Sequence, residues 1–390
     1  MKLKKPNLIV QIVIAVLAGW VLGSVLPSWG IRGLNTFQYL FSQFVRFLVP
    51  LIILGFVTPA IADTGKSAGR LLLVTVAIAY ASTLFAGGLS YAASKTVLPH
   101  VIKGGLDEAS AMASFQPYFK IAIIPFADIV TCLVFSFIVG LGIVACGSDA
   151  VLKVAHQFKD IVNWAIAKLF IPVLPLYVMS VIANTTACGN LAKIAGSCMT
   201  LIVFCTLLTI VLMLIQYAVA GAVAGKNPLK VLATMLPAYF TGLGCCSSAA
   251  TLPVTLRQTQ KNGVSEDTAN LVIPLCANIH LAGSMSNMVA YAMGLMILAG
   301  DPVSLPAFVM YILQISIVAV ASPGVPGGVV IASATIAESA LGFSPERYAI
   351  MMAIYMAFDG MGTACNLTGD GAIAIIVDKI RRRIAGPAEQ

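Results

Sequence analysis

Long apolar runs separated by short polar loops constrain this chain more than any other feature of its sequence. The first run, residues 8–26, contains no charged residue, and runs of similar character follow it along the chain. A helix of about 20 apolar residues spans a bilayer, and in lipid only a helix or a closed barrel satisfies its own backbone hydrogen bonds. We therefore predict an all-α polytopic membrane protein, with its first spans at 8–26, 36–62, 70–95, 118–146, 152–186 and 196–224.

The composition agrees with a membrane protein that has no soluble domain of its own. Of the 390 residues, 59% are hydrophobic and 10% are charged, whereas a soluble domain carries about 25% charged residues. The net charge of +8 does not indicate nucleic-acid binding, because the basic residues lie in short loops and in the two tails. Since an excess of Lys and Arg marks cytoplasmic segments, we expect both termini in the cytoplasm and the protein in the cytoplasmic (inner) membrane of a bacterium.

Four polar residues recur at helical spacing within the apolar run 345–378. Asp359, Thr363, Asn366 and Asp370 follow one another by four, three and four residues, which places their side chains on one face of a helix. An ionised carboxylate in hydrocarbon costs at least ~2.5–3.5 kcal/mol, and no Lys or Arg lies nearby in this segment. Polar packing against other helices would account for a single Asp. Two carboxylates beside an amide and a hydroxyl favour a site for a cation or a transported substrate.

Two further segments, 241–253 and 321–328, interrupt apolar runs with small and polar residues. Irregular backbone at membrane depth is tolerated only where it is buried in protein or lines a polar cavity, and paired interruptions mark transporter binding sites. We predict a re-entrant hairpin at each, followed by spanning helices at 267–299 and 345–378, in an inverted repeat. The alternative is two proline-kinked spanning helices, which leaves the serine pair of the first tip and the glycine-rich second tip unexplained.

The order of these motifs resembles the dicarboxylate/amino acid:cation symporter family over essentially the whole chain. The segments that carry the resemblance are Leu174–Thr185, the serine-rich tip Ser247–Pro253, Ile273–Leu275 with His280–Ser284, the second tip Gly324–Gly327, and the stripe Asp359–Asp370. The resemblance implies eight transmembrane helices, two re-entrant helical hairpins, a homotrimer and an elevator-like movement. Residues 1–230 would be mostly scaffold and trimer contacts, with the third and sixth helices moving with the transport core, and residues 231–390 would form that core.

The resemblance also implies roles for individual residues. Asp359 would hold a substrate ammonium, Asn366 would donate to a substrate carboxylate, and Asp370 would bind Na⁺. Carboxylates pair with ammonium groups, and carboxylate and carbonyl oxygens suit a hard cation. The implied substrate set is Ser247, Ser248, Ser284, Gly324, Val325, Pro326, Asp359, Gly362, Thr363 and Asn366. The implied sodium set is Ser82, Thr83, Cys276, Asn278, His280, Asn366 and Asp370.

Two departures from the family pattern bear on the substrate. Members that carry acidic substrates place an arginine four residues before Asn366 or at the first hairpin tip, where this chain has Gly362 and Cys246. Without that guanidinium, an anionic side chain would lose a buried, charge-assisted pair. We therefore predict a small neutral amino acid such as serine, threonine or alanine. The alternative is a dicarboxylate or an acidic amino acid, although a dicarboxylate would leave Asp359 facing an anion.

Other departures bear on the coupling ion. The Asn and Asp that the family carries in its broken seventh helix are His280 and Ala282 here, and the second hairpin tip is shorter. We expect coupling to Na⁺ with fewer ions than is usual in the family, and H⁺ is the alternative. His280 and Glu338 are the candidate proton carriers. A neutral, hydrogen-bonded histidine and an interfacial or paired carboxylate are the alternatives to those roles.

Other classes of membrane protein lack support in the sequence. No pore-lining repeat or carbonyl filter indicates a channel. Nothing resembles the HExxH or GxSxG motif of an intramembrane hydrolase, and no P-loop is present for ATP-driven transport. We therefore expect a symporter for a small molecule and not an enzyme.

Overall fold

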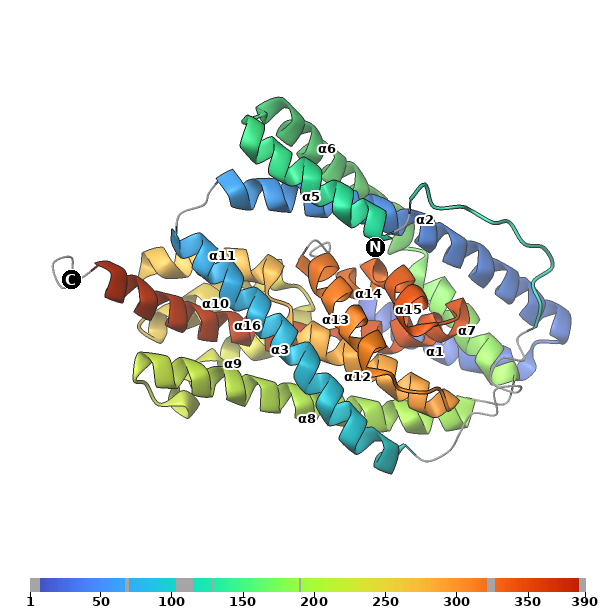
Figure 1. The fold of residues 1–390 in the computed structure, drawn as a ribbon. Coiled ribbons are helices and arrows are strands. Elements are labelled where there is room, and N and C mark those ends of the chain that lie inside the picture. The colour runs from blue at the N-terminus through green and yellow to red at the C-terminus, as the bar shows by residue number, and fades with distance from the viewer. Residues whose placement is uncertain are drawn as a thin grey trace, which may run out of the picture.

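The fold is helical in the part of the chain that the structure describes. The computed structural model describes residues 8–66, 70–102, 115–127, 129–188, 191–320 and 327–385, and the regular elements in these ranges are helices (Figure 1). They are α1 (Leu8–Val25), α2 (Ser28–Lys66), α3 (Arg70–Val101), α5 (Ile129–Cys146), α6 (Asp149–Ala165), the π-helix η1 (Ile166–Phe170), α7 (Leu174–Ala187), α8 (Leu191–Ala224), α9 (Pro228–Cys245), α10 (Ser248–Lys261), α11 (Glu266–Ile279), α12 (Ala282–Ala299), α13 (Leu305–Val320), α14 (Gly328–Ala332), α15 (Ala334–Leu341) and α16 (Pro345–Ala385). The prediction of an all-α chain is confirmed.

Several helical stretches have the length and composition needed to cross a bilayer. Among the described residues, Leu71–Val101, Met199–Ala224 and Glu266–Ala299 qualify singly, and Asp149–Phe170 with Leu174–Asn184 forms a further candidate. Shorter apolar helices lie at Ile14–Val25, Pro50–Pro59, Val134–Cys146 and Leu305–Ala319. The total of eight spans stays a prediction.

The helix predicted over 118–146 begins only at Ile129, so the first part of that prediction is wrong. Pro117 and Pro125 lack the backbone N–H that a helix uses and disfavour helical geometry in the residue before them. Residues 115–127 instead form an irregular segment that is bonded to the start of α2. The Tyr118 N–H donates to the Thr36 hydroxyl (2.9 Å), and the Tyr118 hydroxyl donates to the Trp29 carbonyl (2.8 Å).

The predicted span 152–186 is also not one straight helix. Its two helical parts, α6 with η1 and then α7, meet at an angle of 49°. The break falls at residues 171–173, where Pro172 lacks a backbone donor, and Pro175 follows in the first turn of α7. The span predicted over 36–62 starts earlier than predicted, since α2 begins at Ser28. Apolar composition alone did not reveal these boundaries.

Both predicted hairpins correspond to pairs of helices that pack together. In the first, α9 packs against α10, and the chain turns at Cys246, which has a left-handed φ of 50°. In the second, α13 packs against α14 and α15. The tip at residues 321–326 lies outside the described residues. The re-entrant depth of both hairpins in the membrane stays a prediction.

α16 is the central element around which the others assemble. It packs against α8, α9, α11 and α12, and small residues permit close contacts of the kind common between membrane helices. A Cβ on Gly360 would lie only 2.4 Å from the Leu243 carbonyl oxygen of α9. Figure 1 shows α2, α5 and α6 along one side of the molecule, while α16 runs among the helices of the other side.

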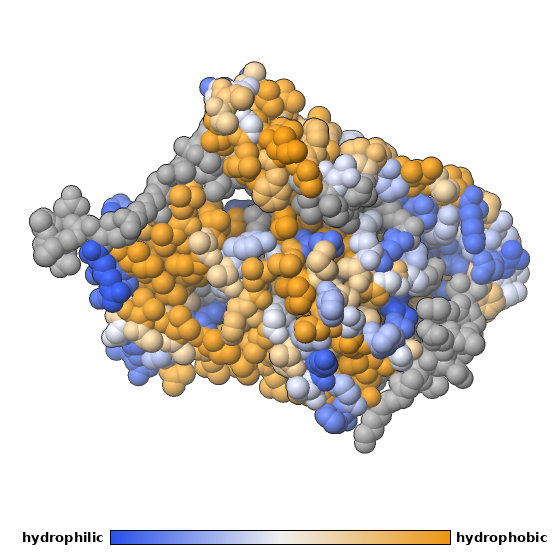
Figure 2. Space-filling view, viewed as in Figure 1, coloured by the Kyte–Doolittle hydropathy of each residue, from blue (hydrophilic) through white to orange (hydrophobic). Residues whose placement is uncertain are grey.

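The surface is apolar over much of the face shown in Figure 2, with hydrophilic residues gathered toward its ends. On α5 the exposed side chains include Val134, Phe135, Ile138 and Leu141. A soluble protein rarely leaves so many large apolar side chains together in water. These features suit contact with lipid or with a neighbouring subunit.

Candidate functional site

The polar stripe predicted near the C-terminus lies on one continuous helix, α16, and points into the protein. Asp359 and Thr363 are each 6% exposed, Asn366 is 2% exposed and Asp370 is fully buried. The spacing argument from the sequence therefore located a buried polar face correctly. What these side chains contact comes from helices that are distant in the sequence.

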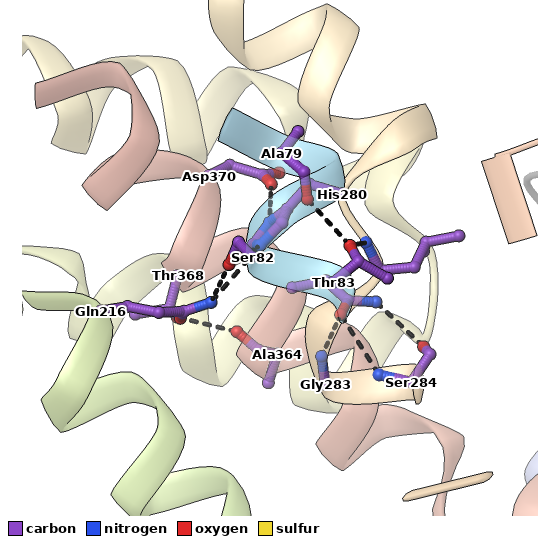
Figure 3. Close-up of polar contacts among 12 residues, drawn as sticks. Ala79, Ser82, Thr83, Gln216, His280, Gly283, Ser284, Ala364, Thr368 and Asp370 are labelled. Carbon is purple, nitrogen blue, oxygen red and sulfur yellow. Dashed lines mark hydrogen bonds and ion pairs between the residues drawn. The ribbon is translucent and has the colours of Figure 1, made fainter. Parts of the chain in front are cut away.

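Asn366 holds the start of α12, where the chain breaks between α11 and α12. Its Oδ1 accepts from the backbone N–H groups of Gly283 (2.8 Å) and Ser284 (3.3 Å), and its Nδ2 donates to the Ser284 hydroxyl (3.0 Å) (Figure 3). Leu281, the residue at the N-cap position, has no side-chain acceptor for these donors. Asn366 therefore caps α12 from another helix, at the end that carries the positive partial charge of the helix dipole.

Asp370 is paired with His280 at the same chain break. The Nδ1 atom of His280 lies 2.9 Å from Oδ1 of Asp370, and both side chains are fully buried. Since a carboxylate accepts, Nδ1 carries the hydrogen and donates it. On the other side of the ring, Nε2 lies 3.0 Å from the Ser82 hydroxyl, which also accepts from Gln216 Nε2 at 3.0 Å (Figure 3).

Gln216 belongs to this network but was missed by the sequence reasoning. It lies on α8, and its Nε2 is also 3.3 Å from Nε2 of His280. The only signal in the sequence was one amide within an otherwise apolar helix. That signal does not tell which neighbour the amide meets.

The other predicted sodium residues divide between the network and the surface. Thr83 accepts from the Leu281 N–H (3.3 Å), and the Cys276 carbonyl accepts from the His280 N–H (2.8 Å), so both support the chain break. The side chain of Asn278 is exposed and donates to the Pro274 carbonyl of its own helix (2.9 Å). The structure therefore does not bring the Asn278 side chain to Asp370.

Few oxygen atoms around Asp370 are free to bind a sodium ion. A hard cation takes oxygen ligands, but one oxygen of this carboxylate already accepts from an imidazole. Its Oδ2 is buried and has no hydrogen-bond partner among the described residues. Within the same ranges, no group of three or more His, Cys, Asp and Glu side chains is arranged to hold a metal ion. A cation here would depend on Oδ2 and on neutral oxygens.

At the other end of the stripe, Asp359 lies where the two hairpins approach α16. Its Oδ2 accepts from the N–H of Gly327 (2.9 Å), the first described residue after the second tip, and its carboxylate is hydrogen-bonded to the Tyr355 hydroxyl. A Cβ on Gly360 would lie 3.2 Å from Sγ of Cys246, at the turn of the first hairpin. The predicted substrate residues Gly324, Val325 and Pro326 lie outside the described residues.

The two serines predicted for the first hairpin tip directly follow Cys246. Ser247 and Ser248 are partly buried, and both of their carbonyls accept from the Thr251 hydroxyl (3.1 and 2.9 Å). This contact closes the first turn of α10. The tip therefore presents small polar groups close to the Asp359 end of the stripe.

At Gly362, α16 lies close to the first turns of α12. A Cβ on Gly362 would lie 3.2 Å from Nδ2 of Asn287 and 3.3 Å from Oγ of Ser284. Ser284 in turn contacts Asn366 and hydrogen-bonds to Tyr355. The predicted residues Asp359, Gly362, Asn366 and Ser284 therefore belong to one continuous polar region, to which Tyr355 and Asn287 are added.

Glu338 lies elsewhere. It is exposed on α15 and lines a cleft that is also bordered by Ser42, Tyr177, Tyr348 and Met352. None of the contacts described for Asp359 and Asp370 involves it. The structure thus separates the two candidate proton carriers, and only His280 contacts the stripe.

Comparison with known proteins identifies relatives over the full length of this arrangement. The family model described as "Sodium:dicarboxylate symporter family" matches residues 8–380. Three proteins described as "Serine/threonine transporter SstT", from three strains of Streptococcus thermophilus, are each 23% identical to the chain over 402, 398 and 402 residues. In each case the similarity covers 97% of this chain and 97% of the relative.

Proposed function

The chain belongs to the sodium:dicarboxylate symporter family, and we propose that it imports a small neutral amino acid together with Na⁺. Membership makes it a multi-pass membrane protein and a cation-coupled symporter rather than an enzyme. The proposed substrates are serine, threonine or alanine. The proposed binding region lies between α12, α16 and the tips of the two hairpins.

The observation that carries this proposal is the buried Asp359 carboxylate. Its hydrogen-bond donors, the Gly327 N–H and the Tyr355 hydroxyl, are neutral, and no Lys or Arg among the described residues forms an ion pair with it. A buried charge is costly unless it is paired. The α-ammonium of an amino acid supplies the missing charge, whereas a dicarboxylate does not.

The substrate carboxylate is proposed to lie near the start of α12. The positive end of this helix and the neutral donors around it favour an anionic group. Those donors would be Asn366 Nδ2, which now donates to Ser284, and the hydroxyls of Ser247, Ser248 and Thr363. Backbone N–H groups near Gly324 and Val325 would complete the contact, with Pro326 shaping the tip.

The side chain of the substrate is proposed to be neutral because of Gly362. An arginine at this position would pair with a second carboxylate, but glycine offers no charge, and an aspartate side chain would be desolvated without compensation. The description of the 23% identical relatives as serine/threonine transporters supports the same substrate class.

The coupling ion is proposed to be Na⁺, bound near Asp370 through Oδ2, hydroxyl oxygens such as those of Ser82 and Thr83, and backbone carbonyls near Cys276, Asn278 and Asn366. The His280 imidazole already occupies Oδ1 of the Asp370 carboxylate with a hydrogen bond. This favours fewer bound sodium ions than a fully acidic site would hold. Coupling to H⁺ is the alternative.

A second candidate function follows from the family description itself. The chain could carry a dicarboxylate or an acidic amino acid with Na⁺ or H⁺, as the words "Sodium:dicarboxylate symporter" indicate for the family. The missing arginine at Gly362 and Cys246 argues against this candidate. We therefore place it second.

The assembly and the movement are proposed from the family resemblance. A homotrimer would bury part of the apolar surface of the scaffold, residues 1–230, and the core, residues 231–390, would move across the bilayer as an elevator. The exposed apolar side chains of α5 are compatible with such contacts. Both termini are proposed to lie in the cytoplasm, at the inner membrane of a bacterium.

A competition experiment in proteoliposomes tests the substrate class. Uptake of labelled serine is measured under an inward Na⁺ gradient, with excess unlabelled serine, alanine, aspartate or succinate outside. We expect strong inhibition by serine and alanine and little by aspartate or succinate. Strong inhibition of serine uptake by aspartate or succinate, with none by alanine, would favour the second candidate and would contradict the neutral substrate.

A further inference from the structure

We propose that Asn287 is a substrate-contacting residue that selects amino acids with a hydroxyl on the side chain. This inference rests on the proposed function, since it assigns a role within the neutral amino acid site. It identifies the feature by which serine and threonine would be preferred over alanine. The argument begins with the position of Asn287 on α12.

Asn287 follows Ser284 by three residues, so both side chains lie on the same face of α12. Asn287 is 1% exposed, and its Oδ1 has no hydrogen-bond partner among the described residues. A buried amide oxygen that stays unpaired costs about 1–3 kcal/mol. An acceptor at this position therefore gains from any ligand that brings a donor.

The surroundings of Asn287 show that its amide group borders the proposed site. Its Nδ2 lies 3.2 Å from the position that a Cβ on Gly362 would take, and the Ser284 hydroxyl lies 3.3 Å from the same position. Ser284 is connected through Tyr355 to Asp359, the proposed partner of the ammonium. The amide thus adjoins the residue at which a family arginine would meet an acidic side chain.

The chemistry of the amide selects for a hydroxyl. An Asn side chain presents one acceptor and one donor group, and a hydroxyl can both donate and accept. The hydroxyl of serine or threonine can therefore satisfy the amide, while the methyl group of alanine leaves it unpaired. A site built to hydrogen-bond a hydroxyl discriminates against analogues that lack it.

Another buried amide, that of Gln38, has an unpaired oxygen but lies outside the proposed site. Gln38 on α2 is 2% exposed and its Oε1 also has no partner among the described residues. It has no contact with the stripe residues in the hydrogen bonds described. Gln38 is therefore a matched control: a buried amide with the same orphan atom, outside the proposed site.

The test compares kcat/KM for serine and alanine in the unmodified protein, Asn287→Leu and Gln38→Leu. Leucine keeps a similar side-chain size without hydrogen bonding. We expect a preference for serine that falls about three- to tenfold in Asn287→Leu, the size of one neutral hydrogen bond, and that is unchanged in Gln38→Leu. Because the ratio is measured within each protein, it does not depend on how much protein folds.

If Asn287→Leu does not fold, competition between amino acids for uptake by the unmodified protein provides a second measurement. Threonine should inhibit serine uptake more strongly than valine, which replaces the hydroxyl by a methyl group. Equal inhibition, or an unchanged serine-to-alanine ratio in Asn287→Leu, would overturn the role of Asn287 while leaving neutral amino acid transport in place. No uptake of serine or alanine by the unmodified protein would overturn the proposed function and this inference together.

Discussion

The two aspartates of α16 occupy different chemical environments although they lie on the same helix face. Among the described residues, Asp359 accepts only from neutral donors, whereas Asp370 is paired with the imidazole of His280. The first is therefore suited to a substrate ammonium. Asp370 has one oxygen, Oδ2, without a partner among the described residues, so it can bind a cation while His280 donates to the other oxygen.

Replacing Asp359 tests its role directly. In Asp359→Asn the ammonium loses its counter-charge, so we expect kcat/KM for serine uptake to fall at least about 100-fold, the scale of a broken buried ion pair. Size-exclusion chromatography serves as the control for intact assembly. Serine uptake at the normal rate in this variant would remove the amino acid interpretation.

Replacing the Asp370 pair tests the coupling ion. Asp370→Asn should raise the Na⁺ concentration for half-maximal serine uptake by about tenfold or more, because a carboxylate ligand of the cation is lost. His280→Asn should act in the opposite direction, because it frees Oδ1 from the imidazole. An unchanged Na⁺ dependence in Asp370→Asn would show that this carboxylate only supports packing.

Replacing Gly362 tests selectivity, and the structure supplies a control. In Gly362→Ala the Cβ would press on Ser284 and Asn287, so serine uptake should fall modestly through overpacking of about 1–3 kcal/mol. Gly362→Arg should show a larger packing effect together with new inhibition by aspartate, because a guanidinium pairs with its carboxylate. If both variants respond alike to excess aspartate, position 362 does not set the charge of the substrate.

At this scale the spacing of residues predicted one buried helix face, whereas the neighbours Ser82, His280 and Ser284 came only from the family resemblance. The spacing of Asp359 to Asp370 was sufficient to place four side chains on one buried face. Asn287 and Gln216 lie on α12 and α8, and their proximity to that face depends on how those helices cross α16. Periodicity within a single helix contains no information about such crossings.

At the scale of elements, the break between α11 and α12 is the structural centre of the site. α11 ends there and α12 begins. Asn366 accepts from the backbone N–H groups at the start of α12, and Thr83 accepts from the Leu281 N–H. Interrupted helices of this kind position charged ligands in transporters. The family resemblance at His280 to Ser284 implied the break, whereas the capping residue was not predicted.

The capping contact gives a prediction about stability. Asn366→Ala removes the two backbone hydrogen bonds at the start of α12 and the one to the Ser284 hydroxyl. We expect the loss of the cap to cost about 0.5–2 kcal/mol, seen as a lower Tm in detergent. Ser284→Ala is the comparison variant, because it removes the hydroxyl that contacts Asn366 and Tyr355 but keeps the two backbone hydrogen bonds of the cap. A Tm of Asn366→Ala no lower than that of Ser284→Ala would mean that the cap is unimportant.

Helix boundaries were harder to predict where a segment is apolar but contains prolines that prevent a regular helix. Residues 115–127 are apolar enough to continue into α5, but Pro117 and Pro125 exclude a regular helix and the segment bonds to α2 instead. The bend between η1 and α7 has the same origin in Pro172 and Pro175. Hydropathy identifies which segments avoid water, and proline positions decide whether they are continuous helices.

At the scale of the whole molecule, ion pairs connect both ends of α16 to the helices that form the site. Arg347 near its start pairs with Asp301, which follows α12, and Arg381 near its end pairs with Asp267 of α11 (3.0 Å). The exposed Arg381–Asp267 pair contributes little by itself, and the packing of α16 against α11 and α12 connects the three helices more strongly. Their movement as one body is a proposal. That behaviour is what an elevator-like transport core requires.

The central claim is that an ion gradient drives a neutral amino acid through the Asp359 site. The most direct measurement is accumulation of labelled serine in proteoliposomes under an imposed inward Na⁺ gradient without a pH gradient. The account predicts accumulation above the outside concentration, abolished when choline replaces Na⁺ and absent in Asp359→Asn. Accumulation of serine that follows a pH gradient and is indifferent to Na⁺, or accumulation only of aspartate or succinate, would contradict it.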